Sequence, residues 1–175
     1  MRLFALTAIV AFSACADADA PAPAADAAAA PSVLAPEALF GRLPTGVAGL
    51  PRVAASRETD GAMGYEVARA TATYAADSTD ASGPRVVLTV LDLGTATMAE
   101  QMGFGWGLDG GTPDTTLAGF PALVYPTTPG GETGIDVLVA GRFFVEAKGT
   151  GVPMETTETA IRALDVSAFA TLAAE

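Results

Sequence analysis

The chain has 175 residues, which suits one domain with a substantial core, and it carries one cysteine, no histidine and a formal net charge of −11. The single thiol excludes an internal disulfide and a multi-cysteine metal site, and the missing histidine removes the usual general base and metal ligand, so we expect no metal and no cofactor. Because the basic residues, eight arginines and Lys148, form no cluster in the sequence, we also expect no nucleic acid partner.

Residues 1–15 have the three-part layout of a secretory signal peptide. Arg2 precedes an apolar stretch over residues 3–12, which is too short to be a stable membrane span. The tetrapeptide Phe12-Ser13-Ala14-Cys15 resembles the lipobox of bacterial lipoproteins. That resemblance implies removal of residues 1–14 and lipidation of Cys15 by acyl chains such as palmitate.

The lipobox resemblance also implies a location. Two or more acyl chains anchor a protein stably, whereas one chain binds a membrane marginally. Ala16 follows the cysteine, and by the same resemblance this residue favours the outer membrane over the inner membrane, facing the periplasm or the cell surface. A different interpretation stays open, because Ala14-Cys15-Ala16 also fits the A-x-A site of ordinary signal peptidase, which would release an unanchored, secreted domain.

Residues 15–36 are expected to be a lipidated cysteine followed by a disordered linker. After Cys15 the segment consists almost entirely of Ala, Pro and Asp, and it cannot bury enough apolar surface to offset the entropy of ordering. Its prolines favour extended conformations. We therefore expect a spacer that lifts one folded domain, residues 37–175, away from the bilayer.

The folded domain is predicted from alternating apolar patterns, capping signals and turn residues. Strands are expected at Arg52–Thr59, Gly64–Tyr74, Arg85–Leu93, Thr115–Tyr125, Gly134–Ala140 and Phe143–Lys148. Helices are expected at Glu37–Leu43, after the Thr97-x-x-Glu100 capping box, at Pro153–Leu164 and after Asp165 as the N-cap. Gly141-Arg142 is expected to be a tight turn.

These elements predict an α+β fold with a mostly antiparallel sheet of about five to six strands and helices packed on it. The continuous apolar run Arg85–Leu93 indicates a central strand, and Ala68, Ala70 and Ala72 form a flat face suited to a helix. The element order and the closing Arg-Phe-Phe-Val strand are similar to those of the PsbP-like α/β/α sandwich. That resemblance implies no activity.

Two local features are candidate binding sites. The glycine-rich segment Gly103–Gly111 carries Phe104 and Trp106, which are candidates for a ligand lip, because glycines permit close approach and aromatic rings offer contact area. The preferred interpretation is a loop whose Trp106 caps the core. Arg142 is a candidate anion contact, and the alternative places it in a hairpin turn with the nearby Glu146 and Lys148 facing solvent.

Four loop aspartates could supply oxygen ligands for Ca²⁺, but their spacing matches no EF-hand, and we interpret them as solvated turn residues: Asp77, Asp80, Asp109 and Asp114. The acidity indicates a solubility device, adaptation to a saline habitat, or a cationic partner. The leading hypothesis is a non-enzymatic envelope lipoprotein that binds an envelope protein or a small ligand. The alternative is a carboxylate-dependent hydrolase acting on envelope polymers, for which the sequence identifies no catalytic pair.

Overall fold

The computed structural model describes residues 32–62, 65–77, 83–95, 115–125 and 131–174. The strands are β1 (Gly46–Val47), β2 (Leu50–Ala62), β3 (Tyr65–Ala75), β4 (Arg85–Asp92), β5 (Thr115–Leu117), β6 (Phe120–Tyr125), β7 (Glu132–Val139) and β8 (Phe143–Thr150). The helices are α1 (Pro36–Phe40), α3 (Met154–Ala163) and α4 (Val166–Ala173). The described part is thus an α+β fold, as the sequence predicts.

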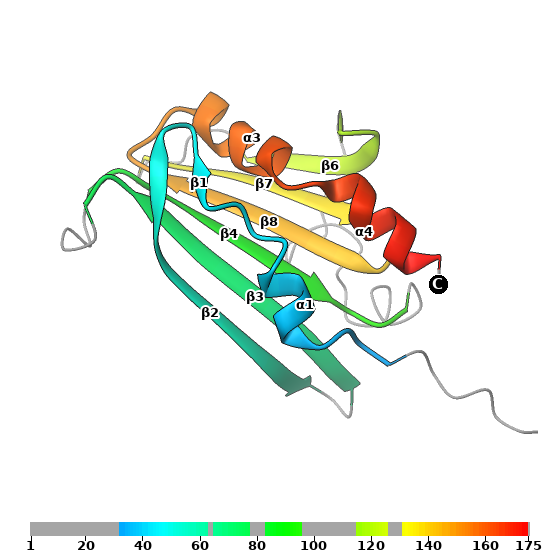
Figure 1. Ribbon diagram of the computed structural model, residues 1–175. Coiled ribbons are helices and arrows are strands. Elements are labelled where there is room, and N and C mark those ends of the chain that lie inside the picture. Colours follow the sequence, from blue (N-terminus) through cyan, green and yellow to red (C-terminus); the bar gives the residue numbers. More distant parts are fainter. Residues whose placement is uncertain (1–31, 63–64, 78–82, 96–114, 126–130, 175) are drawn as a thin grey trace, which may run out of the picture.

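All eight described strands form one antiparallel sheet in the order β1-β2-β3-β4-β8-β7-β6-β5. Each half of the sheet is a four-stranded meander, and the two meanders meet where β4 pairs with β8. The three helices lie on one face of this sheet, with α3 and α4 crossing β7 and β8 and α1 lying over β3 (Figure 1). The apolar strand β4 is central, which confirms the prediction from its continuous hydrophobicity.

The expected number of five to six strands is wrong, because Ala-Gly turns divide the chain more often than its sequence suggests. Residues 115–125 form two strands rather than one, joined at Ala118-Gly119, and the turn between β7 and β8 is centred on Ala140-Gly141 rather than Gly141-Arg142. In each turn both central residues have positive φ, which matches the right-handed twist of a hairpin. Ala48-Gly49, between β1 and β2, has the same conformation.

The first hairpins of the two meanders also resemble each other in sequence. Residues 45–51 read TGVAGLP and residues 115–121 read TTLAGFP, so four of seven positions are identical. The matched segments lie at opposite edges of the sheet, as β1 with β2 and as β5 with β6. The two halves of the sheet therefore share a local sequence device as well as a topology.

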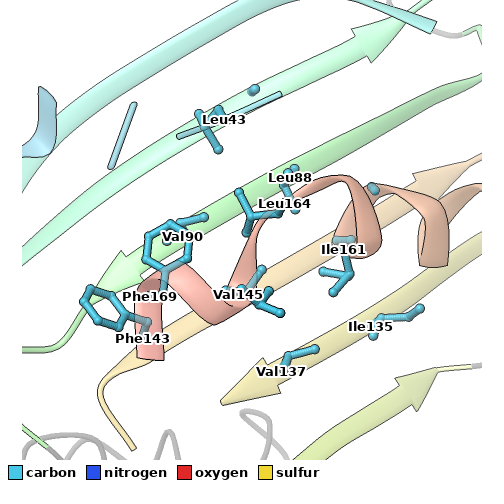
Figure 2. Close-up of a cluster of buried hydrophobic side chains, with 14 of the residues drawn as sticks. Leu43, Leu88, Val90, Ile135, Val137, Phe143, Val145, Ile161, Leu164 and Phe169 are labelled. Atoms are coloured by element: carbon cyan, nitrogen blue, oxygen red, sulfur yellow. The ribbon is translucent and has the colours of Figure 1, made fainter. Parts of the chain in front are cut away.

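The main core lies between the sheet and the three helices. Alternate residues of β3, β4, β7 and β8 point into it and meet Ile161, Leu164 and Phe169 from the helical layer (Figure 2). The rings of Phe143 and Phe169 lie 5.2 Å apart between centroids, a separation typical of favourable aromatic pairs. The flat alanine face of β3 is fully buried under this layer, as its sequence predicts.

Helix α3 approaches β8 closely at Gly149. A Cβ atom on Gly149 would clash with the hydroxyl groups of Thr157 and Thr133, which are buried and hydrogen-bonded to each other at 2.7 Å. The chain continues into α4, where the Asp165 carboxylate accepts a hydrogen bond from the Ala168 N–H at 3.2 Å. This confirms the predicted cap. The helix expected after the Thr97-x-x-Glu100 capping box lies outside the described residues.

Candidate functional site

Polar side chains gather on the sheet face that points away from the helices. Because side chains alternate along strands, residues paired across neighbouring strands share a face. The register pairs Thr71 with Thr89, Thr89 with Glu146, and Glu146 with Asp136. These four residues form a row across β3, β4, β8 and β7. Tyr125 on β6 reaches the end of this row.

Asp136 is the most unusual member of this row, because its carboxyl group is buried with 8% of the residue exposed. The Tyr125 hydroxyl donates a hydrogen bond to Asp136 Oδ2 at 3.0 Å. Burial raises the pKa of Asp136 to about 6, while the Tyr125 hydrogen bond lowers that pKa, the neighbouring Glu146 charge raises it, and the Lys148 charge lowers it. The carboxyl group of Asp136 therefore holds its proton to a higher pH than an exposed aspartate does.

Lys148 and Glu146 complete the cluster from β8. Lys148 Nζ lies 2.7 Å from Glu146 Oε1, with 65% of the lysine side chain exposed and 26% of the glutamate side chain exposed. The hydrogen bond to Glu146 is the largest cause that raises the pKa of Lys148. We call Tyr125, Asp136, Glu146 and Lys148 the polar cluster. It combines one buried carboxyl group with an ion pair at the surface.

An apolar cluster adjoins the polar cluster on the same face. Its buried members are Val67 of β3, Leu91 of β4, Leu93 just beyond the end of β4, and Phe144 of β8. Leu138 of β7 packs against them. The four buried members are only 0–8% exposed, so they form a second, smaller core on this face. The accessible groups beside this core are those of the polar cluster.

The predicted anion contact Arg142 is occupied by a carboxylate of the same chain. Its Nε and Nη2 donate to the two oxygens of Asp92, each at 2.8 Å, and this bond is the first cause that raises the pKa of Arg142. Asp92 is fully buried and also accepts hydrogen bonds from the backbone N–H of Leu34 at 2.8 Å and of Gly94 at 2.9 Å. Arg142 Nη2 donates further to the Ser32 carbonyl at 3.4 Å.

This arrangement, which we call the Asp92 clamp, ties the start of the described chain to the sheet. It joins residues 32–34 to the end of β4 and to the β7–β8 turn. Ser32 and Leu34 therefore contact the sheet through this clamp. Arg142 serves this internal contact, and its guanidinium also lies 5.0 Å from the centroid of the Phe143 ring.

Several predicted site residues lie outside the described residues: Cys15, Phe104, Trp106, Asp80, Asp109 and Asp114. Asp77, the remaining calcium candidate, is exposed just after β3. Within the described ranges, no three cysteine or acidic residues come close enough to hold a metal ion. Among those same residues, no helix has the length and apolarity needed to span a bilayer.

Asp136 and Tyr125 are not among the residues singled out from the sequence, although part of the signal is present there. Ile135, Val137 and Val139 alternate towards the core, so Asp136 must lie on the opposite face of β7. Its pairing with Glu146 depends on the register between β7 and β8, which the turn at Ala140-Gly141 sets.

Comparison of the chain with protein-family models, with curated protein sequences and with solved structures found no match.

Proposed function

We propose that the protein is an exported lipoprotein of the bacterial envelope, more specifically of the outer membrane, held by acyl chains on Cys15. The lipobox-like residues 12–15 support this proposal, and the Asp92 clamp supports it from the other end of the linker. In this proposal residues 16–31 are the tether, because their Ala, Pro and Asp composition is that of a linker, and the clamp holds the chain that follows at Ser32 and Leu34. A flexible chain of that length spans roughly 20–25 Å on average, which is enough to clear the lipid headgroups.

The domain itself acts, in this proposal, as a non-enzymatic binding module for an envelope protein or a small ligand. The observation that carries this part is the polar cluster, in which the buried Asp136 is paired across the strands with Glu146, and Glu146 with the exposed Lys148. Burial of a carboxyl group costs stability even where a hydrogen bond offsets part of the cost, and groups with strongly shifted pKa values concentrate at functional sites. Asp136 is such a group.

The anchor is tested by fractionation in the native host or a bacterial surrogate. The Cys15→Ser variant is expected to leave the membrane fraction and accumulate unprocessed or soluble, while the wild-type chain stays with the membrane. A membrane-bound Cys15→Ser variant would contradict the lipid anchor. The ordinary signal peptidase site predicts instead that both chains are soluble.

The binding surface is tested by crosslinking in the envelope, followed by mass spectrometry of the captured partner or ligand. Lys148→Glu changes the polar cluster and is expected to lose whatever the wild-type protein captures. Arg162→Glu is the matched control, because Arg162 is an exposed cation of α3 on the helical side. If the wild-type protein captures nothing, or if the two variants lose the partner equally, the proposed binding surface is wrong.

A second candidate function is carboxylate-dependent hydrolysis of envelope polymers, favoured by the direct pairing of Asp136 with Glu146. Such enzymes need one protonated and one ionised carboxyl group about 5–9.5 Å apart. Paired residues on one sheet face have Cβ atoms about 4.5–5.5 Å apart, and the raised pKa of Asp136 suits the acid. A glycan-release assay in which Asp136→Asn and Glu146→Gln both retain full activity would refute this candidate.

A further inference from the structure

Three arginines that are separated in the sequence gather around helix α1. Arg52 and Arg57 of β2 place their guanidinium carbons 5.2 Å and 4.9 Å from the centroid of the Phe40 ring. Arg42 follows α1 and lies 5.6 Å from the centroid of the Phe169 ring in α4. We call Arg42, Arg52 and Arg57 the arginine patch. The rings and strands hold these cations in place, so little side-chain entropy remains to be lost on binding.

Nearby acids neutralise the arginine patch in part. Glu37 Oε1 lies 3.0 Å from Arg57 Nε, and both side chains are well exposed. The pKa of Asp165 is lowered mainly by the hydrogen bond from Ser167, and the positive charge of Arg42 lowers it further. The patch therefore keeps an excess of positive charge on a chain whose overall charge is −11.

The opposite face of the sheet has the reverse balance. Its acidic residues come from β2, β7 and β8: Glu58, Asp60, Glu132, Asp136 and Glu146. Arg69 binds two of them, Glu58 at 3.1 Å and Asp60 at 3.9 Å, and Lys148 binds Glu146. Arg85 also lies on this face, so its five acids meet three cations, whereas the three cations of the arginine patch meet two acids.

The tether enters the domain beside the arginine patch. Leu34 is fixed by the Asp92 clamp, and α1 begins two residues later, at Pro36. A short linker holds a domain at an effective concentration of about millimolar relative to its anchoring surface, so a weak attraction suffices to orient it. Anionic lipid headgroups attract arginines that come within a Debye length, about 8 Å at physiological ionic strength.

We infer that the arginine patch rests on the anionic phospholipids of the membrane that holds the anchor. The acidic face with the polar cluster then points away from the bilayer, where a partner can reach it. This inference rests on the proposed lipid anchor and adds an orientation to it. The chemistry required of the surface is a layer of phosphate-bearing anionic headgroups.

The test uses arginine-specific modification of the chain that starts at Cys15. Its thiol is the one cysteine of the sequence, so it can be coupled to a maleimide phospholipid in vesicles of phosphatidylcholine, with or without phosphatidylglycerol. Phenylglyoxal is then added, and the modification of each arginine is followed by mass spectrometry. On anionic vesicles, Arg42, Arg52 and Arg57 are expected to react about fivefold more slowly than on neutral vesicles, the factor expected from attraction of one arginine to an anionic leaflet. Arg69 is expected to react equally on both, and high salt should remove the difference.

Variants separate orientation from general crowding at the vesicle surface. Substituting Arg42→Gln and Arg57→Gln together should remove the slower reaction of Arg52, whereas Arg69→Gln with Arg162→Gln should preserve it. Urea unfolding confirms that both double variants fold. Equal slowing of Arg69 and the patch, or no slowing on anionic vesicles, would overturn the inference. Because a synthetic lipid replaces cellular acylation in this experiment, a negative result would refute the orientation alone. The lipid anchor itself is tested separately by the Cys15→Ser fractionation.

Discussion

Replacing Arg142 with methionine leaves the buried Asp92 carboxylate without its guanidinium partner while keeping most of the side-chain volume. Two charge-assisted hydrogen bonds of 2.8 Å are lost, and the backbone N–H groups of Leu34 and Gly94 remain as donors. Removing one partner of a buried pair costs about 3–5 kcal/mol. A domain of this size is stable by about 5–15 kcal/mol, so the loss is a large fraction of the total.

Urea unfolding of the Arg142→Met variant measures this loss directly, with Lys148→Met as the control. Lys148 also pairs with a carboxylate at 2.7 Å, but 65% of its side chain is exposed, so its removal should cost at most about 1 kcal/mol. Arg142→Met should also speed protease cleavage near Leu34, which the Asp92 clamp holds. The reasoning is refuted if the two variants lose equal stability.

Three further predictions concern packing and the polar cluster. Gly149→Ala should destabilise the domain by about 1–3 kcal/mol in urea unfolding, because the added Cβ clashes with the Thr157 hydroxyl. The control Gly61→Ala places its Cβ in open space and should change the free energy of unfolding by less than about 0.5 kcal/mol. Equal effects of the two substitutions would contradict the close approach of α3 to β8. The pKa of Asp136 is raised to about 6 from 3.8, so between these pH values the folded state binds a proton that the unfolded state has lost. The contribution of Asp136 to the free energy of unfolding should therefore fall as the pH rises from about 4 to 6. Asp136→Asn should remove that part of the pH dependence, and an unchanged slope between pH 4 and 7 would refute the assignment. Tyr125→Phe removes a hydrogen bond that lowers the Asp136 pKa, so an NMR titration should show that pKa moving upwards, and a downward shift would contradict the geometry.

The sequence predicts most of the fold because the strands carry strong local signals. The continuous apolar run of β4, the alanine face of β3 and the Asp165 cap each have one physical interpretation, and the structure confirms all three. Helix α3 is predicted at Pro153–Leu164 and observed at Met154–Ala163. These features depend on neighbouring residues, which a sequence displays directly.

The errors come from features that depend on backbone conformation or on distant pairing. An Ala-Gly pair is a weaker turn signal than Asn-Gly, so the division of residues 115–125 into β5 and β6 is missed. The bond between Arg142 and Asp92 joins positions fifty residues apart, and nothing local distinguishes it from a free arginine in a turn. The pairing of Asp136 with Glu146 likewise needs the β7–β8 register.

The central claim is that a lipid on Cys15 holds this domain at the envelope. The most direct test is the intact mass of the protein purified from the membrane fraction of its native host, with fragmentation of its N-terminus. The account predicts a chain that begins at Cys15 and is heavier by the mass of its acyl chains. A chain that begins elsewhere, or a Cys15 thiol that carries no lipid, would contradict it.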